Sequence, residues 1–290
     1  MASNDGSFFH AGSRTGFLLA HGFSGSPLQL RYVTNGLVRA GFTVSAPQLI
    51  GHNGSFDDLK YSTWKDWYRG VEEAFFELKK SCDIIIAGGF SMGSVLALKL
   101  AADHPDDVHG LTLFAPVFNY DGWSVPKAVR LFSVVCDNWT ADRFQFRERE
   151  PYGIKNARLR EFVMNAINTE DGAKPSLPVI PGRSLMQFRF MAKTVKRELR
   201  NIRQPTLVCH PRHDDRGSLT NVELLQRQLA GRVTTVVLDD CYHVVTLDQQ
   251  RDIVLEAALD FGFKLEARLG GSMTSHPAAG RPAAAVLKSA

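Results

Sequence analysis

The stretch IIIAGGFSMGSVLALKLAA, residues 84–102, decides the fold of this chain. Its first half is an apolar, β-branched run typical of a buried strand, and its second half has the composition of a helix. Between them, residues 89–93 form the pattern G-x-S-x-G, in which a tight turn lifts the serine hydroxyl clear of the sheet. Both glycines are needed because the strand and the helix pass close together there. The pattern also fits an inert serine in a glycine-rich turn, so the meaning of Ser91 depends on the rest of the chain.

Length and composition favour one large globular core. The chain has 290 residues, of which 44% are hydrophobic and 22% charged, and its net charge of +4 does not indicate a nucleic-acid partner. No apolar run approaches the length of a membrane span, and residues 1–10 lack the pattern of a secretory signal. The cysteines are scattered, without a C-x-x-C pair. We therefore expect a reduced, cytoplasmic protein in which the cysteines bind no metal.

Strand and helix patterns alternate on both sides of the central stretch. Apolar strands alternating with amphipathic helices predict a mostly parallel α/β sheet covered by helices on both faces. The predicted strands are residues 14–20, 41–46, 84–87, 111–115, 205–210 and 233–238. The predicted helices outside the central stretch are residues 28–40, 63–80, 219–229 and 246–261.

The alternation breaks between about residues 117 and 202, where no strand is predicted and residues 185–199 form the clearest helix. This segment is interpreted as a helical cap or lid inserted into the sheet domain. The predicted organisation is therefore a core of residues 1–117 and 203–264, a cap of residues 118–202, and a disordered tail of residues 265–290. The tail is assigned on composition, because it is rich in Ala, Gly, Ser and Pro.

A serine nucleophile needs a base within hydrogen-bonding reach, and the base needs a carboxylate to orient it. In a sheet of this kind the expected order is Ser, Asp or Glu, then His, each in a loop after a strand. His243 follows the last predicted strand, and Asp214 follows the strand before it. We predict that Ser91, Asp214 and His243 are the catalytic residues. Asp215 is the main alternative for the acid.

The acid has two further alternatives, Asp239 and Asp240, which lie close to His243 in the sequence. They are more plausibly the residues that end the last strand. Asp214 is preferred to Asp215 because the acid of this architecture directly follows the first loop residues, and its neighbour can face solvent.

A tetrahedral intermediate needs two hydrogen-bond donors for its oxyanion. The backbone N–H of Met92, directly after the nucleophile, is the first candidate. The second is the backbone N–H of Phe23, in the loop after the first buried strand, where Gly22 permits close approach of the backbone. The side chains of Phe23 and Met92 are predicted to line the substrate pocket. Plain core packing is the alternative for both side chains.

Five motifs together resemble the α/β-hydrolases of the small bacterial carboxylesterase and monoacylglycerol lipase group, over about residues 14–262 except the cap. They are HGFSGSP (21–27), AP followed by GH (46–47 and 51–52), GFSMG (89–93), HD (213–214) and HVVTLD (243–248). The resemblance implies an α/β-hydrolase fold and hydrolysis of carboxylic esters through an acyl-enzyme. It also implies Asp214 as the acid, and requires neither a metal nor an organic cofactor.

The expected substrate is a small-molecule ester with a short to medium acyl chain. A monoacylglycerol lipase, or a thioesterase acting on an acyl carrier or coenzyme A, would use the same residues. The carrier is considered because Lys and Arg outnumber Asp and Glu in residues 143–203, although a solvated outer face would look the same. A non-catalytic binding protein on the same fold is the alternative from another class. The cap cations considered are Arg189, Lys193, Lys196, Arg197 and Arg200.

Overall fold

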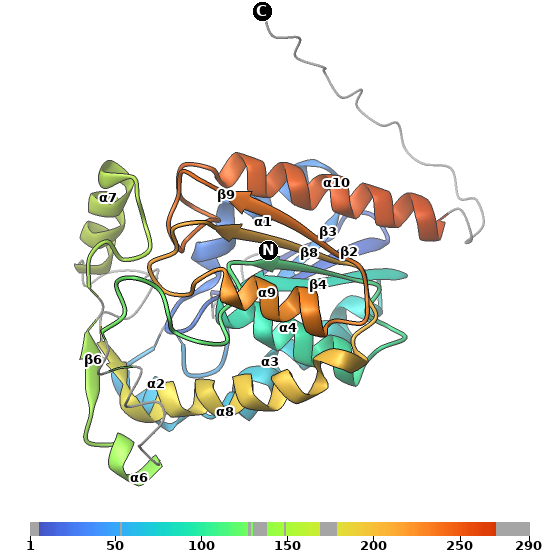
Figure 1. Ribbon diagram of the computed structural model, residues 1–290. Helices are drawn as coiled ribbons and strands as arrows, with labels where there is room; N and C mark the ends of the chain where they lie inside the picture. The colour runs from blue at the N-terminus through green and yellow to red at the C-terminus, as the bar shows by residue number, and fades with distance from the viewer. Residues whose placement is uncertain are drawn as a thin grey trace, which may run out of the picture.

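The computed structural model describes residues 6–52, 54–126, 129, 138–147, 149–168 and 179–270. A seven-stranded sheet with the order β1-β3-β2-β4-β5-β8-β9 forms its centre (Figure 1). Every neighbouring pair of strands is parallel except β1 and β3. The predicted mostly parallel α/β sheet is confirmed. The strands are β1 (Phe8–His10), β2 (Thr15–Ala20), β3 (Thr43–Ala46), β4 (Ile84–Phe90), β5 (Gly110–Phe114), β8 (Thr206–Pro211) and β9 (Val233–Leu238).

The central strands are buried along their whole length. Every residue of β2, β4, β5 and β8 is buried, which explains why these strands appear in the sequence as unbroken apolar runs rather than alternating patterns. The edge strand β1 has three residues, two of them exposed, and pairs antiparallel with β3. Three residues, Phe-Phe-His, are too few to give a periodic signal, so this strand was not predicted.

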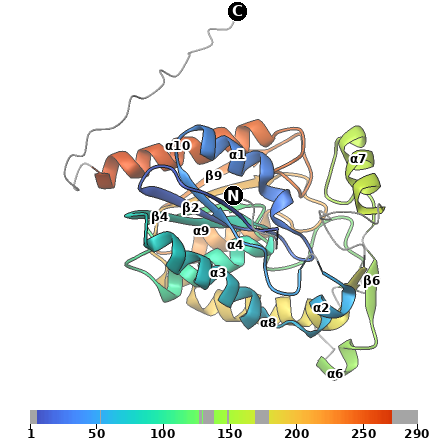
Figure 2. The same cartoon turned by 180° about the vertical axis from the view of Figure 1, so that it is seen from behind.

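Helices cover both faces of the sheet, as predicted. Side chains from α1 and α10 form one apolar cluster with the sheet, and side chains from α3, α4, α8 and α9 form the other. Figure 2, the view from behind, shows the same two layers around the sheet. The helices of the main domain are η1 (Pro27–Leu30), α1 (Arg31–Arg39), α2 (Phe56–Tyr61), α3 (Trp64–Lys79), α4 (Met92–Asp103), α9 (Thr220–Gln228) and α10 (Arg251–Gly270).

The segment between β5 and β8 contains the predicted cap region. Its described elements are α6 (Asn138–Ala141), β6 (Gln145–Arg147), α7 (Ala157–Asn168), β7 (Val179–Pro181), α8 (Gly182–Glu198) and η2 (Leu199–Asn201). Strands β6 and β7 pair antiparallel, so the prediction of no strand in this segment is wrong. Three residues per strand are too few to produce a two-residue periodicity that could be detected.

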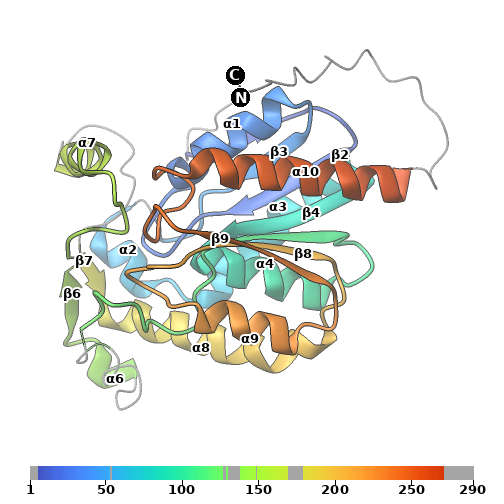
Figure 3. The same cartoon turned by 45° about the horizontal axis from the view of Figure 1, so that its top comes forward.

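The cap region does not lie over the sheet as one layer. α7 and the β6–β7 pair project beyond the carboxyl ends of the parallel strands, whereas α8 runs beneath α4 (Figure 3). Met186, Phe188 and Met191 of α8 are buried in the apolar cluster that contains α4. The second half of the predicted cap is therefore partly built into the core of the sheet domain.

The last core helix is longer than predicted. α10 continues to Gly270, so residues 265–270, expected in a disordered tail, are helical. Leu265 is buried in the apolar cluster beside the sheet and lies over Gly110 at the start of β5. Burial of that side chain favours helix over disorder for these residues. The remainder of the predicted tail, residues 271–290, lies outside the described residues.

Candidate active site

Ser91 occupies the sharp turn between β4 and α4. Its backbone has φ +54° and ψ −111°, a left-handed conformation that costs energy for a residue with a side chain. The backbone N–H of Ser91 donates to the carbonyl of Phe114 on the neighbouring strand at 2.8 Å. A Cβ at position 89 would lie 2.3 Å from the Ala20 carbonyl oxygen, and one at position 93 would lie 1.9 Å from it. Both glycines of the motif are therefore required by the approach of β2.

The structure brings together the three side chains predicted to be catalytic. His243 Nε2 lies 2.9 Å from Ser91 Oγ, and His243 Nδ1 lies 2.8 Å from Asp214 Oδ2. Residues 91, 214 and 243 come from three loops that follow β4, β8 and β9, which end at one edge of the sheet. All three side chains are buried, so water competes little for these hydrogen bonds.

The surroundings of Asp214 keep it ionised. Burial favours its protonated form, but His243 and the backbone N–H of Gly217 oppose this, and the pKa of Asp214 falls below its ordinary value. Asp214 Oδ1 accepts from the N–H groups of Arg216 and Gly217 at 2.7 and 3.0 Å. A carboxylate can only accept, so His243 Nδ1 donates to it and Nε2 is the acceptor that faces the Ser91 hydroxyl.

From the sequence, Asp215, the neighbour of the acid, could face solvent. Its side chain is instead fully buried. Oδ1 accepts from the N–H of His243 at 3.2 Å, and Oδ2 accepts from the N–H of Gly153 at 3.1 Å. Arg216 Nε lies 3.3 Å from Oδ2 and forms an ion pair with this carboxylate. Asp215 therefore joins the loop of His243 to the first part of the cap.

A second carboxylate, Asp248, also joins the loop of His243 to the cap. It accepts from the N–H groups of Lys155 and Asn156 in the cap and from that of Tyr242, beside the histidine. The sequence placed Asp248 within the motif HVVTLD, but nothing in the pattern indicated what it contacts. By contrast, Asp239 and Asp240 have exposed side chains paired with Arg212 and Lys155.

His210 is a further buried residue of the site that sequence reasoning did not single out. Its Nε2 lies 2.9 Å from the Gly217 carbonyl oxygen and 3.8 Å from Asp214 Oδ2. Burial lowers the pKa of His210, which favours the neutral ring. The side chain thus supports the loop that carries Asp214 through its contact with Gly217. Across the residues with described coordinates, no group of His, Cys, Asp or Glu is arranged to hold a metal ion.

The two predicted oxyanion donors lie in adjoining segments. Met92 is the first residue of α4, where backbone N–H groups have no acceptor within the helix. Phe23 lies in a turn closed by the Gly25 N–H and the Gly22 carbonyl at 3.1 Å. Because Ala20 pairs with Gly89 in the sheet, this turn continues beside the one that carries Ser91. Neither N–H has an acceptor within the described ranges.

The side chains of these two residues belong to one buried apolar cluster. Phe23 is almost buried and packs against His52, Trp67 and Phe188, with ring centroids 5.6–6.1 Å apart. Phe188 belongs to α8, so this aromatic cluster joins the loop of Phe23 to the cap region. Met92 is fully buried in the apolar cluster of α3, α4 and α8.

The cap cations considered for steering an anionic substrate lie along α8, except Arg200, which lies in η2. Lys196 donates to Asn119 Oδ1 at 2.7 Å, and burial lowers its pKa. Glu198 pairs at 3.1 Å with Lys99, which lies about 12 Å along α4 from Ser91 at 1.5 Å per residue. The second half of α8 therefore lies beside the far part of α4, away from the elbow.

A serine on a strained strand-to-helix turn, backed by His and Asp from later loops, places the molecule in the class of folds built around a nucleophile elbow. Consistent with this, residues 17–257 match the model of the Alpha/beta hydrolase family. The chain belongs to that family. None of the helices with described coordinates is both long and apolar enough to cross a membrane.

Two curated relatives align with nearly the whole chain. It is 28% identical over 256 residues to the thermostable monoacylglycerol lipase of Bacillus sp. (strain H-257), covering 88% of this chain and 92% of that protein. It is 24% identical over 264 residues to a carboxylesterase of Bacillus subtilis (strain 168), covering 89% and 96%. The two relatives are named for different activities, although their sequence identities to this chain, 28% and 24%, are similar.

Solved structures resemble the fold closely. One, from work on the metagenome-derived lipolytic enzymes LipS and LipT, superimposes with a TM-score of 0.73 at 24% identity, covering 89% of this chain and 97% of that one. The monoacylglycerol lipase of Paleococcus ferrophilus superimposes with a TM-score of 0.72 at 16% identity, covering 89% and 98%. At these identities the likeness establishes the fold alone.

Proposed function

We propose that this chain hydrolyses carboxylic esters, with Ser91 as nucleophile, His243 as general base and Asp214 as the acid that orients it. The observation that carries the proposal is the contact of one imidazole with both partners, at 2.9 Å to Ser91 Oγ and 2.8 Å to Asp214 Oδ2. A hydroxyl is a poor nucleophile at neutral pH, and this arrangement supplies both the proton acceptor and the tautomer that it needs.

The reaction proceeds through an acyl-enzyme. Ser91 Oγ attacks the ester carbonyl carbon while its proton passes to His243 Nε2. The tetrahedral intermediate collapses, the bond to the alcohol oxygen breaks, and His243 gives its proton to the departing alcohol. Water then attacks the acyl-enzyme while His243 takes its proton, the bond to Ser91 Oγ breaks, and His243 gives the proton to Ser91 Oγ as the carboxylic acid leaves. Asp214 stays ionised and stabilises the imidazolium at each stage.

Two backbone N–H groups stabilise the oxyanion in this proposal, those of Phe23 and Met92. Their support is positional: Met92 directly follows Ser91, and Phe23 lies in the turn after β2, whose Ala20 pairs with Gly89. Neither N–H has another acceptor in the described chain. Each is expected to lower the barrier by about 3 kcal/mol. The Phe23 side chain is also proposed to contact the substrate, together with the aromatic cluster around it.

The substrate is proposed to be an ester of short to medium acyl length or a monoacylglycerol. The named relatives support these two classes equally. A panel of p-nitrophenyl esters of graded length, together with monoacylglycerols, separates them by kcat/KM. Acyl thioesters belong in the same panel as the alternative that includes an acyl carrier. Charge reversal of Arg189, Lys193 and Arg197 should raise KM only for the anionic thioesters if α8 steers them.

Labelling by a fluorophosphonate distinguishes an enzyme from a non-catalytic binding protein of the same fold. The wild-type chain should label at Ser91, and Ser91→Ala should abolish both labelling and ester hydrolysis. Ser94→Ala is the matched control, because Ser94 lies one turn away but its Oγ donates to the Gly89 carbonyl at 2.7 Å. A folded wild-type protein that fails to label, or Ser91→Ala that still labels, would contradict the proposal.

A further inference from the structure

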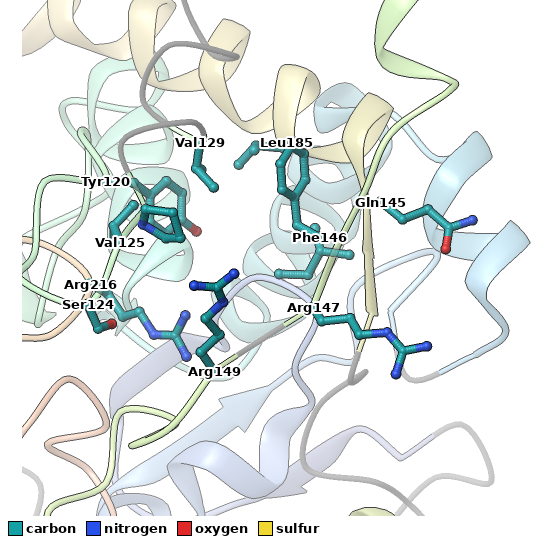
Figure 4. Close-up of a pocket in the computed structure, with 12 residues that line it drawn as sticks. Tyr120, Ser124, Val125, Val129, Gln145, Phe146, Arg147, Arg149, Leu185 and Arg216 are labelled. Atoms are coloured by element: carbon teal, nitrogen blue, oxygen red, sulfur yellow. The ribbon is translucent and has the colours of Figure 1, made fainter.

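A cavity of about 250 Å³ lies between the cap and the loop that carries Asp214 (Figure 4). One side is apolar, formed by aromatic and aliphatic side chains, and the other side carries arginines. Within the described residues no Asp or Glu lines the cavity. The lining comprises Tyr120, Ser124, Val125, Pro126, Val129, Gln145, Phe146, Arg147, Arg149, Ile180, Leu185 and Arg216.

Two of the arginines face the interior of the cavity. In Figure 4 the guanidinium groups of Arg149 and Arg216 extend into the space below Tyr120, whereas Gln145 and Arg147 extend to the other side of β6. This matches the alternation of β6, which turns Phe146 inward. The side chain of Arg149 has no carboxylate partner in the part of the chain that the structure describes. Arg216 is held at its Nε by Asp215.

The cavity is tied to the catalytic loops by hydrogen bonds. Ser124, in its wall, donates through its N–H and its Oγ to the Asp215 carbonyl at 3.2 and 2.8 Å. Arg216 donates its backbone N–H to Asp214 Oδ1 at 2.7 Å while its side chain lines the cavity. A ligand in the cavity would therefore lie next to the residues that orient His243.

We propose that this cavity binds an anionic oxygen group, a carboxylate or a phosphate, carried on a short apolar chain. This inference rests on the proposed ester hydrolysis and assigns it a substrate class, namely esters with a second, negatively charged group. Guanidinium groups are suited to planar or tetrahedral oxyanions, which they bind with two donors each. At about 30 Å³ per water volume the cavity holds the equivalent of roughly eight waters, enough for a chain of a few carbons.

Direct binding tests the cavity without hydrolysis. Hexanoate, hexyl phosphate and hexanol are titrated by calorimetry into the Ser91→Ala protein, with and without Arg149→Gln. At least one anion should bind more tightly than hexanol, and Arg149→Gln should raise its Kd about tenfold. Arg158→Gln is the matched control, because it removes one exposed positive charge from α7, outside the cavity. Equal binding of anions and hexanol, or equal losses in both arginine variants, would overturn the proposal.

Kinetic assays determine whether the anionic group belongs to the acyl side or the alcohol side of the substrate. One pair of esters compares mono-p-nitrophenyl suberate with p-nitrophenyl octanoate, and a second compares a monoacylglycerol phosphate with a monoacylglycerol. Arg149→Gln should lower the anionic-to-neutral ratio of kcat/KM about tenfold in one pair, which identifies the acyl or the alcohol side. An unchanged ratio in both pairs would refute the proposal. If no ester is hydrolysed, the proposed function fails and the calorimetry still decides the cavity.

Discussion

Replacing Asp215 by alanine should destabilise the protein far more than replacing an exposed aspartate of the same region. The change leaves two buried donors, the N–H groups of His243 and Gly153, without their acceptors. Each unpaired donor costs about 1–3 kcal/mol, so the free energy of unfolding should fall by about 2–6 kcal/mol. Arg216 also loses its carboxylate partner, and because its side chain is only 17% exposed this loss adds to the figure.

The assay is urea unfolding followed by circular dichroism, with Asp239→Ala as the matched control. Asp239 pairs with Arg212, but its side chain is 67% exposed, and such surface pairs are worth about 0–1 kcal/mol. In the folded fraction of the Asp215→Ala protein, kcat should also fall about 100-fold, because a small displacement of His243 misaligns the proton transfer. A loss of stability no larger than that of Asp239→Ala would refute the role assigned to Asp215.

Three other predictions concern the acid, the turn that carries Ser91, and a buried histidine near Phe23. Asp214→Asn should lower kcat by about 10⁴-fold by favouring the wrong tautomer of His243, with unfolding midpoints near wild type; a loss below tenfold would count against Asp214. Gly93→Ala should prevent stable folding, because its Cβ would lie 1.9 Å from the Ala20 carbonyl oxygen, whereas Gly70→Ala, with open space around it in α3, should stabilise by about 1 kcal/mol. Burial lowers the pKa of His52 to about 4, so the folded state resists its protonation and stability should fall as pH drops from about 6.5 to 4. In His52→Phe the slope of unfolding free energy against pH in this range, measured by urea unfolding, should be smaller by about 1.4 kcal/mol per pH unit. An unchanged slope would contradict the role assigned to His52.

The sheet was predictable from the sequence because its central strands are buried on both faces. Such strands appear as continuous apolar runs, and the loops that follow them hold the polar residues. The steric demands of the elbow also have a direct signature, since the approach of Ala20 tolerates no side chain at positions 89 and 93. Where an element has three residues, as in β1, β6 and β7, the periodic signal disappears and the sequence did not reveal it.

The sequence by itself determined the family of folds and the loops in which a serine, an acid and a histidine would follow one another. Tertiary structure alone decided which side chain of each loop turns inward. Asp214 and Asp215 are adjacent and chemically identical, yet one contacts the imidazole of His243 and the other its backbone. Contacts with distant segments set that choice, and the same holds for the arginines of the cap cavity. Neither local propensity nor spacing records which distant segment a side chain will meet, because that depends on packing of the whole chain.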